Sequence, residues 1–183
     1  MQKNYINNYF LILYSIIPLT ILAGPTLSLL NIILIDVSFI LYLTIRKDFS
    51  FFKDTTVKML IIFYIYLIFN SIISLEPSYG IYRNFGFLRI IILFISINYF
   101  FQQKNFFNKI FLVWFIILLI ATFDIFFEAK FGKNILGYGS GVPGDRIVSF
   151  FKDEEIIGGY LGGFFLIIIG FFLDKYGYCL LYT

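Results

Sequence analysis

The sequence predicts an all-α membrane protein, a polytopic bundle of about six transmembrane helices. Of its 183 residues, 60% are hydrophobic and only 14% are charged, whereas soluble domains are about 45–50% apolar and about 25% charged. The mean hydropathy is +0.90. Apolar runs long enough to cross a bilayer, roughly 17–25 residues, recur along the whole chain. We therefore expect a single membrane domain over residues 1–183 with the lipid bilayer as its solvent.

Six apolar stretches account for the expected helices. As one helix, the run 10–43 would measure about 50 Å, against a hydrocarbon core of about 30 Å. Gly24 and Pro25 are therefore expected to form a tight turn within it. Pro77 and Gly80 are expected to break the helix at the end of the third span. The predicted spans are 8–23, 27–45, 59–75, 86–101, 110–127 and 156–173, with a polar segment, 128–155, before the last one.

The Lys and Arg residues between the spans predict the orientation, because cytoplasmic loops are enriched in both. With Arg89 left aside inside a span, one side of the membrane has eight of them (3, 46, 47, 53, 58, 104, 109 and 175) and the other has five (83, 130, 133, 146 and 152). Both termini are therefore expected in the cytoplasm. The segment 128–155 is expected outside, in the periplasm of a cell with two membranes.

Composition excludes several kinds of site. The chain has no histidine and one cysteine, Cys179, so it has no histidine base and no internal disulfide. The net charge of +3 is scattered between apolar runs, which does not favour nucleic-acid binding. No cofactor, metal site or catalytic residue is predicted.

Two short patterns that resemble catalytic motifs are interpreted as chance. Gly139, Gly141 and Gly144 spell G-x-G-x-x-G, but no strand precedes them, so we expect loop glycines. Ser149 and Lys152 spell S-x-x-K without the companion motifs of serine hydrolases.

Ionisable residues within or next to the spans are more informative, because each is costly in a membrane unless it is paired or hydrated. Asp36 lies mid-span and is expected to be protonated or bonded to Asn31 and Ser38. Arg89 either snorkels to the headgroups or binds a ligand. Asp124 and Glu128 share a helix face, which a solvated helix end explains as easily as a site does.

Sidedness favours a site at the outer leaflet, where the arginine fork suits a phosphate. Polar residues of several spans fall there on the predicted topology: 70, 74, 76, 83, 89, 124, 128 and 146. The carboxylates 153–155 are expected in the first turn of the last span. Behind them, the pairs Gly158/Gly162 and Gly159/Gly163 are expected to let a neighbouring helix approach closely. Arg146 is left without a structural explanation.

The segment "FGKNILGYGSGVPGDRIVSFFKDEEIIGGYL", after a span ending in "TFDIFFEAK", resembles the O-antigen ligase and O-antigen polymerase family of bacterial membrane glycosyltransferases. The entry "YRNFGFLR" resembles that family's arginine-bearing helix and places Arg89. Ser149 stands where the family usually has glycine, and Glu128 where glutamine is frequent. The residues that fit the family pattern are Asp124, Gly132, Asn134, Gly137, Arg146, Phe151, Asp153, Glu154, Gly158, Tyr160 and Leu161.

The resemblance implies glycan transfer on the periplasmic face of the bacterial inner membrane. A sugar chain would leave an undecaprenyl-pyrophosphate carrier for a lipid A core or a growing glycan, and Arg89 and Arg146 would bind the pyrophosphate. Family members are about twice as long, and a later loop carries a histidine. The chain is therefore expected to be an amino-terminal half, with its activity as an enzyme left open. The alternatives are a transporter or flippase for lipid-linked glycans, and a non-catalytic membrane assembly subunit.

Overall fold

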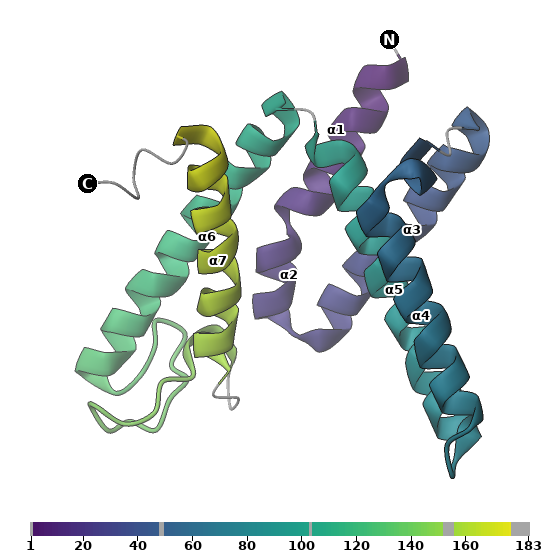
Figure 1. The fold of residues 1–183 in the computed structure, drawn as a ribbon. Coiled ribbons are helices and arrows are strands. Elements are labelled where there is room, and N and C mark those ends of the chain that lie inside the picture. The colour runs from purple at the N-terminus through teal and green to yellow at the C-terminus, as the bar shows by residue number, and fades with distance from the viewer. Residues whose placement is uncertain (1, 48–49, 103, 152–155, 177–183) are drawn as a thin grey trace. The chain divides into compact units, whose positions relative to one another are not determined.

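A computed structural model describes residues 2–47, 50–102, 104–151 and 156–176, and all regular structure in these ranges is helical (Figure 1). The predicted all-α class is confirmed. The α-helices are α1 (Gln2–Ser15), α2 (Ile17–Ala23), α3 (Pro25–Arg46), α4 (Thr55–Ile72), α5 (Pro77–Phe101), α6 (Lys104–Phe131) and α7 (Ile157–Tyr176), with short 3-10 helices η1 (Ser50–Lys53) and η2 (Ser149–Phe151).

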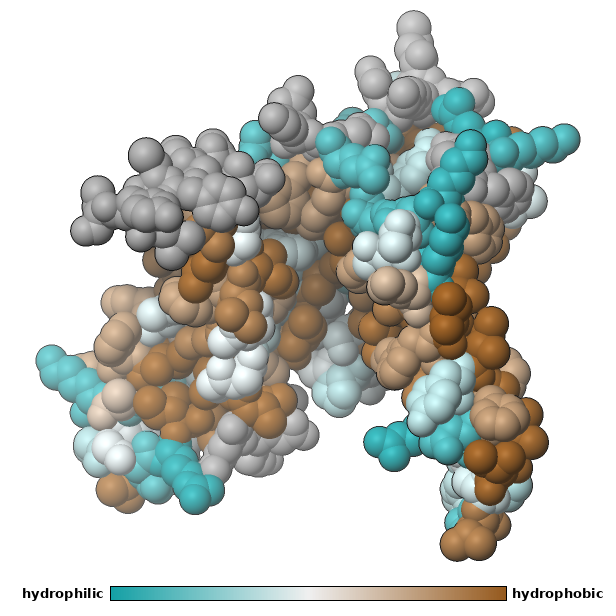
Figure 2. All heavy atoms as spheres, in the orientation of Figure 1, coloured by the Kyte–Doolittle hydropathy of each residue, from teal (hydrophilic) through white to brown (hydrophobic). Residues whose placement is uncertain are grey.

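The helices are those of a multi-pass membrane protein. Five described segments are long and apolar enough to span a bilayer: Tyr5–Ala23, Pro25–Arg46, Thr55–Ile72, Pro77–Phe101 and Phe106–Phe131. The expected sixth span corresponds to a shorter apolar helix, Ile157–Leu173. Its 17 residues would rise about 25 Å, slightly less than a typical hydrocarbon core. Figure 2 shows apolar residues over the visible sides of the helices and polar residues gathered toward helix ends.

Prolines and glycines set the helix boundaries differently from two of the predictions. The Gly24–Pro25 turn is confirmed, since Gly24 has a left-handed φ of 128° and Pro25 begins α3. The first span, however, is divided at Ile16 into α1 and α2, because Pro18, at the second position of α2, has no N–H to continue the ladder of α1. Pro77 also begins a helix, as prolines do at N1, so α5 starts nine residues before the predicted span.

The prediction that Gly80 breaks a helix was wrong, because Gly80 lies inside α5. Its role is close packing against α4. A Cβ added at Gly80 would lie 3.0 Å from both the Cβ and the Oγ of Ser71. Helices α4 and α5 therefore approach each other closely where Gly80 meets Ser71.

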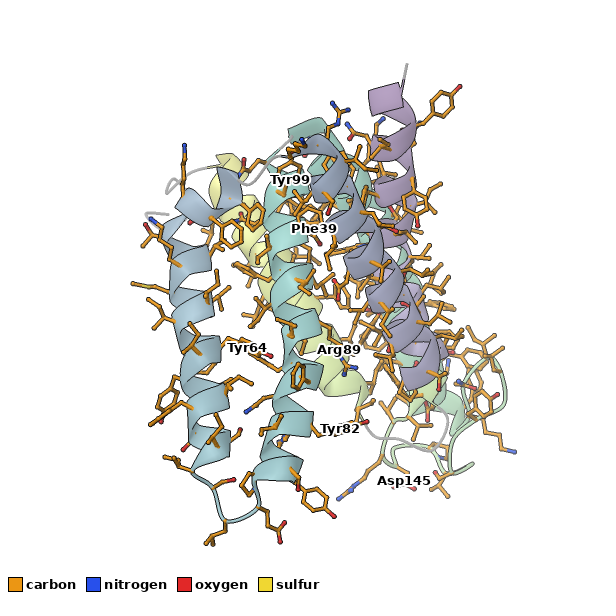
Figure 3. All side chains as sticks on the ribbon, turned by 90° about the vertical axis from the view of Figure 1, so that its right-hand side faces the viewer. Phe39, Tyr64, Tyr82, Arg89, Tyr99 and Asp145 are labelled. Carbon is orange, nitrogen blue, oxygen red and sulfur yellow. The ribbon has the colours of Figure 1, made fainter. Side chains whose placement is uncertain are left out.

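Contacts divide the chain into two compact units, Met1–Ile17 with Thr26–Lys109, and Pro18–Pro25 with Ile110–Thr183. The first unit has an aromatic core. The rings of Phe10 and Phe100 lie 4.3 Å apart, and those of Phe39 and Tyr99 lie 5.8 Å apart (Figure 3). The buried Tyr14 hydroxyl donates to Ser96 Oγ at 2.8 Å. This packing joins α1, α3 and α5.

Polar contacts fix the α4–α5 hairpin of the first unit at two levels. Asp54 caps α4 by accepting from the backbone N–H of Thr56 at 2.9 Å, and its other oxygen accepts from Asn98 Nδ2 at 3.0 Å. Nearer the turn, Asn84 Nδ2 donates to the backbone oxygen of Leu67 at 2.9 Å and also to Ser71 Oγ. The side-chain amides of Asn98 and Asn84, both on α5, thus donate to residues at the start of α4 and within it. Hydrogen bonds as well as apolar contacts therefore set the register of the two helices.

The second unit consists of α2, most of α6, α7 and the segment that connects α6 to α7. Trp114 of α6 packs edge-on against Phe164 of α7, with ring centroids 5.3 Å apart. The Tyr160 hydroxyl donates to the backbone oxygen of Pro18 at 3.3 Å, while its ring lies 5.6 Å from that of Phe151. These contacts place the start of α7 beside α2 and beside the end of the connecting loop.

Candidate functional site

The described loop after α6, residues 132–151, has a defined path that starts at Gly132. Its N–H donates to the backbone oxygen of Glu128 at 2.7 Å and ends α6, while its own oxygen accepts from the Gly141 N–H at 2.9 Å. Gly132 has a φ of 75°, which favours glycine. A Cβ there would lie 2.6 Å from the carbonyl carbon of Gly141. The loop thus folds back onto the helix end through a position open only to glycine.

Two buried carboxylates of α6 bind the far end of this loop. Asp124 is 0% exposed and Glu128 is 3% exposed. Asp124 Oδ2 accepts from Ser149 Oγ at 2.6 Å, and its Oδ1 accepts from the Ile135 N–H at 3.0 Å. The two oxygens of Glu128 accept from the backbone N–H groups of Val148 at 3.1 Å and Ser149 at 2.6 Å. The interpretation of this pair as a solvated helix end was therefore wrong.

Ser149 is the residue on which these bonds converge. It is fully buried and has a left-handed φ of 49°, a conformation that is strained for a residue with a Cβ. Its N–H binds Glu128, its hydroxyl binds Asp124, and its backbone oxygen accepts from Asn134 Nδ2 at 2.7 Å. Three hydrogen bonds therefore hold a backbone conformation that the residue would otherwise avoid.

Asn134 completes the framework from inside the loop. Its Oδ1 accepts from the Tyr138 N–H at 2.7 Å, and its own N–H donates to the Tyr138 oxygen at 2.8 Å. It is only 3% exposed. Asn134 therefore closes the turn 134–138 and joins it to Ser149, so both halves of the loop are tied to one buried polar cluster.

Arg146 lies on the exposed part of this loop, three residues before Ser149. Its neighbour Asp145 is also exposed (Figure 3). The backbone N–H of Arg146, 2.8 Å from Asp145 Oδ1, and the side chain of Ser140 hold the pKa of Asp145 below its usual value. Asp145 is therefore ionised at neutral pH, and a negative charge stands beside the arginine.

Arg89 belongs to the first unit and Arg146 to the second, and each is described within its own unit. Arg89 is exposed on α5 and leaves the helix on the side away from α4 (Figure 3). Its charge acts electrostatically on Asp36 of α3. The bonds expected between Asp36 and Asn31 or Ser38 are absent, because both Asp36 oxygens lack a hydrogen-bond partner.

The other predicted features fall in place as follows. Gly139, Gly141 and Gly144 are loop glycines with positive φ angles, as expected. A Cβ added at Gly158, Gly159, Gly162 or Gly163 would meet nothing within 4 Å. The close helix contact expected at these glycines is therefore not made by the described residues of the second unit. Lys152, the carboxylates 153–155 and Cys179 lie outside the described residues.

Two apolar hollows lie within the second unit. One, of about 350 Å³, runs between α6 and α7 past Leu118, Thr122 and Gly162. The other, of about 300 Å³, lies between α2 and α6 and is lined on the loop side by Leu136, Tyr138 and Phe150. Among the described residues, no group of three or more His, Cys, Asp or Glu could hold a metal ion.

Comparison of the chain with protein-family models, with curated proteins and with solved structures found no match.

Sequence reasoning missed the role of Ser149 and treated Asn134 only as part of a pattern. The available signal was the pair Asp124 and Glu128. Two carboxylates on one face of a helix that is otherwise almost wholly apolar need donors, and the polar segment that follows is the nearest source of backbone N–H groups.

Proposed function

We propose that this chain acts as a membrane protein of the O-antigen ligase and polymerase type. In this proposal it binds an undecaprenyl-pyrophosphate-linked glycan at the periplasmic face of the bacterial inner membrane. The glycan is destined for a lipid A core or for a growing glycan. The exposed guanidinium of Arg146 contacts the pyrophosphate, and Arg89 is a second candidate contact.

One observation carries most of this proposal. The resembled family usually has glycine where this chain has Ser149, and Ser149 has a left-handed backbone with φ 49°, the conformation that glycine adopts most easily. If the likeness in sequence were due to chance, the position of the family's glycine would not be expected to coincide with a residue whose backbone is left-handed. The matched pattern residues Asp124, Gly132 and Asn134 are likewise those that shape the loop.

The loop also supports the choice of Arg146 as a phosphate contact. An arginine on a mobile loop would lose side-chain and backbone freedom on binding, whereas a loop tied down three residues away has already lost much of it. The planar guanidinium can donate two parallel hydrogen bonds to phosphate oxygens. As a leaving group, pyrophosphate would be stabilised by the same contact.

The test is binding of undecaprenyl pyrophosphate to the protein in lipid nanodiscs. Arg146→Lys keeps the charge but removes the fork, so we expect binding about tenfold to a hundredfold weaker, the equivalent of a charge-assisted contact worth roughly 1.5–3 kcal/mol. Asp145→Asn removes a neighbouring negative charge and should strengthen binding. Arg89→Lys should weaken it only if Arg89 shares the site.

Lys130→Ala and Lys133→Ala serve as matched controls, since both lysines are exposed near the same loop. If either weakens binding as much as Arg146→Lys does, then surface charge explains the binding, and the assignment of Arg146 is contradicted.

The uncovered face of α7 favours a second candidate, the non-catalytic assembly subunit. Within the second unit, no described atom lies within 4 Å of a Cβ built at Gly158, Gly159, Gly162 or Gly163, and small residues allow the close approach of another membrane helix. On this candidate function, Gly159→Leu with Gly163→Leu should abolish co-purification with a partner membrane protein, while Arg146→Lys leaves it intact. Unchanged co-purification in the leucine variant would reject the candidate.

A further inference from the structure

The first unit contains a buried carboxyl group that the proposed function does not use. Asp36 lies near the middle of α3 (Pro25–Arg46), one of the five membrane-spanning segments, and is 5% exposed. Neither of its oxygens has a hydrogen-bond partner in the part of the chain that the structure describes. An ionised carboxylate in this position would have lost its water without gaining donors, which is strongly unfavourable.

No donor among the described residues reaches either oxygen of Asp36. Two polar side chains of the same helix bond elsewhere: Asn31 Nδ2 donates to the backbone oxygen of Leu13 at 3.2 Å, and Ser38 is bonded to the Tyr9 hydroxyl at 2.9 Å. The Tyr14 hydroxyl of α1 donates to Ser96. A proton on Asp36 would remove its charge and change it from a pure acceptor into a donor.

Two ionisable groups on other helices of the first unit interact electrostatically with Asp36. Tyr14 of α1 is one, and Arg89 of α5 is the other. Figure 3 shows the Arg89 side chain leaving α5 on the side away from α4, where α3 lies. The guanidinium charge attracts an ionised Asp36, yet no hydrogen bond joins them. Arg89 therefore opposes protonation from a distance without satisfying the carboxylate.

We infer that Asp36 is an intramembrane proton-binding site that is partly occupied near neutral pH, and that its occupancy rises when the positive charge of Arg89 is removed. One consequence rests on the proposed function: an anion that neutralises Arg89 would also promote proton uptake by Asp36. Binding of a pyrophosphate headgroup at Arg89 would then be coupled to the uptake of a proton.

The test is infrared spectroscopy of the protein in micelles of a detergent without ester groups, at a pH of about 7. Exposed Asp and Glu, with pKa values of about 4, are ionised there, so the carbonyl stretch of a protonated carboxyl isolates a buried acid. We expect this band in the unaltered protein, with its shift in D₂O, and its loss in the isosteric variant Asp36→Asn. The band should be larger in Arg89→Gln.

Three results decide between the parts of this inference. A band that is absent from the unaltered protein, or that persists in Asp36→Asn, overturns the proton site. Equal bands in the unaltered protein and Arg89→Gln overturn the role of Arg89. Inorganic pyrophosphate should enlarge the band in the unaltered protein but not in Arg89→Gln. If it has no effect while the other results hold, the coupling to an anion is overturned, and the proton site stands independently of the proposed function.

Discussion

Replacing Glu128 by alanine should release the end of the loop from α6. The buried backbone N–H groups of Val148 and Ser149 would lose their acceptor. Hydrogen bonds to charged groups contribute about 1.5–3 kcal/mol each, so we expect the loop to be destabilised by about 3–5 kcal/mol. Amide hydrogen exchange at these two residues, measured by mass spectrometry, should accelerate roughly a hundredfold to several thousandfold.

Glu128→Gln is the matched control. Its side-chain oxygen can still accept a hydrogen bond, and glutamine is frequent at this position in the resembled family, so exchange should rise far less than in Glu128→Ala. Lys130→Ala, an exposed change two residues along α6, should leave exchange unaltered. Slow exchange at Val148 and Ser149 in Glu128→Ala would show that the carboxylate does not hold the loop.

The second large effect is expected from Gly132→Ala. The new Cβ would lie 2.6 Å from the carbonyl carbon of Gly141 and 2.8 Å from its oxygen, on backbone that has to move aside. The left-handed φ of 75° adds about 1–2 kcal/mol for any L-residue with a Cβ. With the overlap included, we expect a loss of about 3 kcal/mol or more. The Gly141 amide, which donates to the Gly132 oxygen, should then exchange much faster by NMR.

Gly137→Ala separates backbone strain from overlap. Gly137 has a similar φ of 88°, but a Cβ there meets nothing within 4 Å. We expect only the conformational penalty, about 1–2 kcal/mol, and a correspondingly smaller change in exchange. Equal effects of the two substitutions would mean that the packing of Gly132 against Gly141 does not shape the loop.

The buried carboxylates Asp124 and Glu128 have a consequence for any ligand of Arg146. Two negative charges beneath the loop are already satisfied by four donors, from Ile135, Val148 and Ser149. They are therefore compensated locally and repel an anion less than free carboxylates would. Asp145 is different, because it is exposed and ionised beside Arg146, which is why its neutralisation should strengthen anion binding.

The sequence by itself determined the class and the approximate spans. Apolar runs that are long enough to cross a bilayer have few alternatives to membrane helices. In lipid, every backbone N–H and C=O group must find its hydrogen-bond partner within the segment. The Gly24–Pro25 turn was predictable for the same local reason: the run around it is too long for one helix. Proline was ambiguous, because it ends one helix and begins another equally well, and only the structure shows that Pro77 starts α5.

Only the tertiary structure decided what the polar residues do. Composition could place Asp36 and Asp124 in or at the end of apolar helices, but the state of a buried carboxylate depends on donors supplied by other segments. For Asp124 these come from residues 11 and 25 positions along the chain, and for Asp36 none comes. Two aspartates that look alike in sequence thus differ because one has a loop folded onto it, whereas no described donor reaches the other.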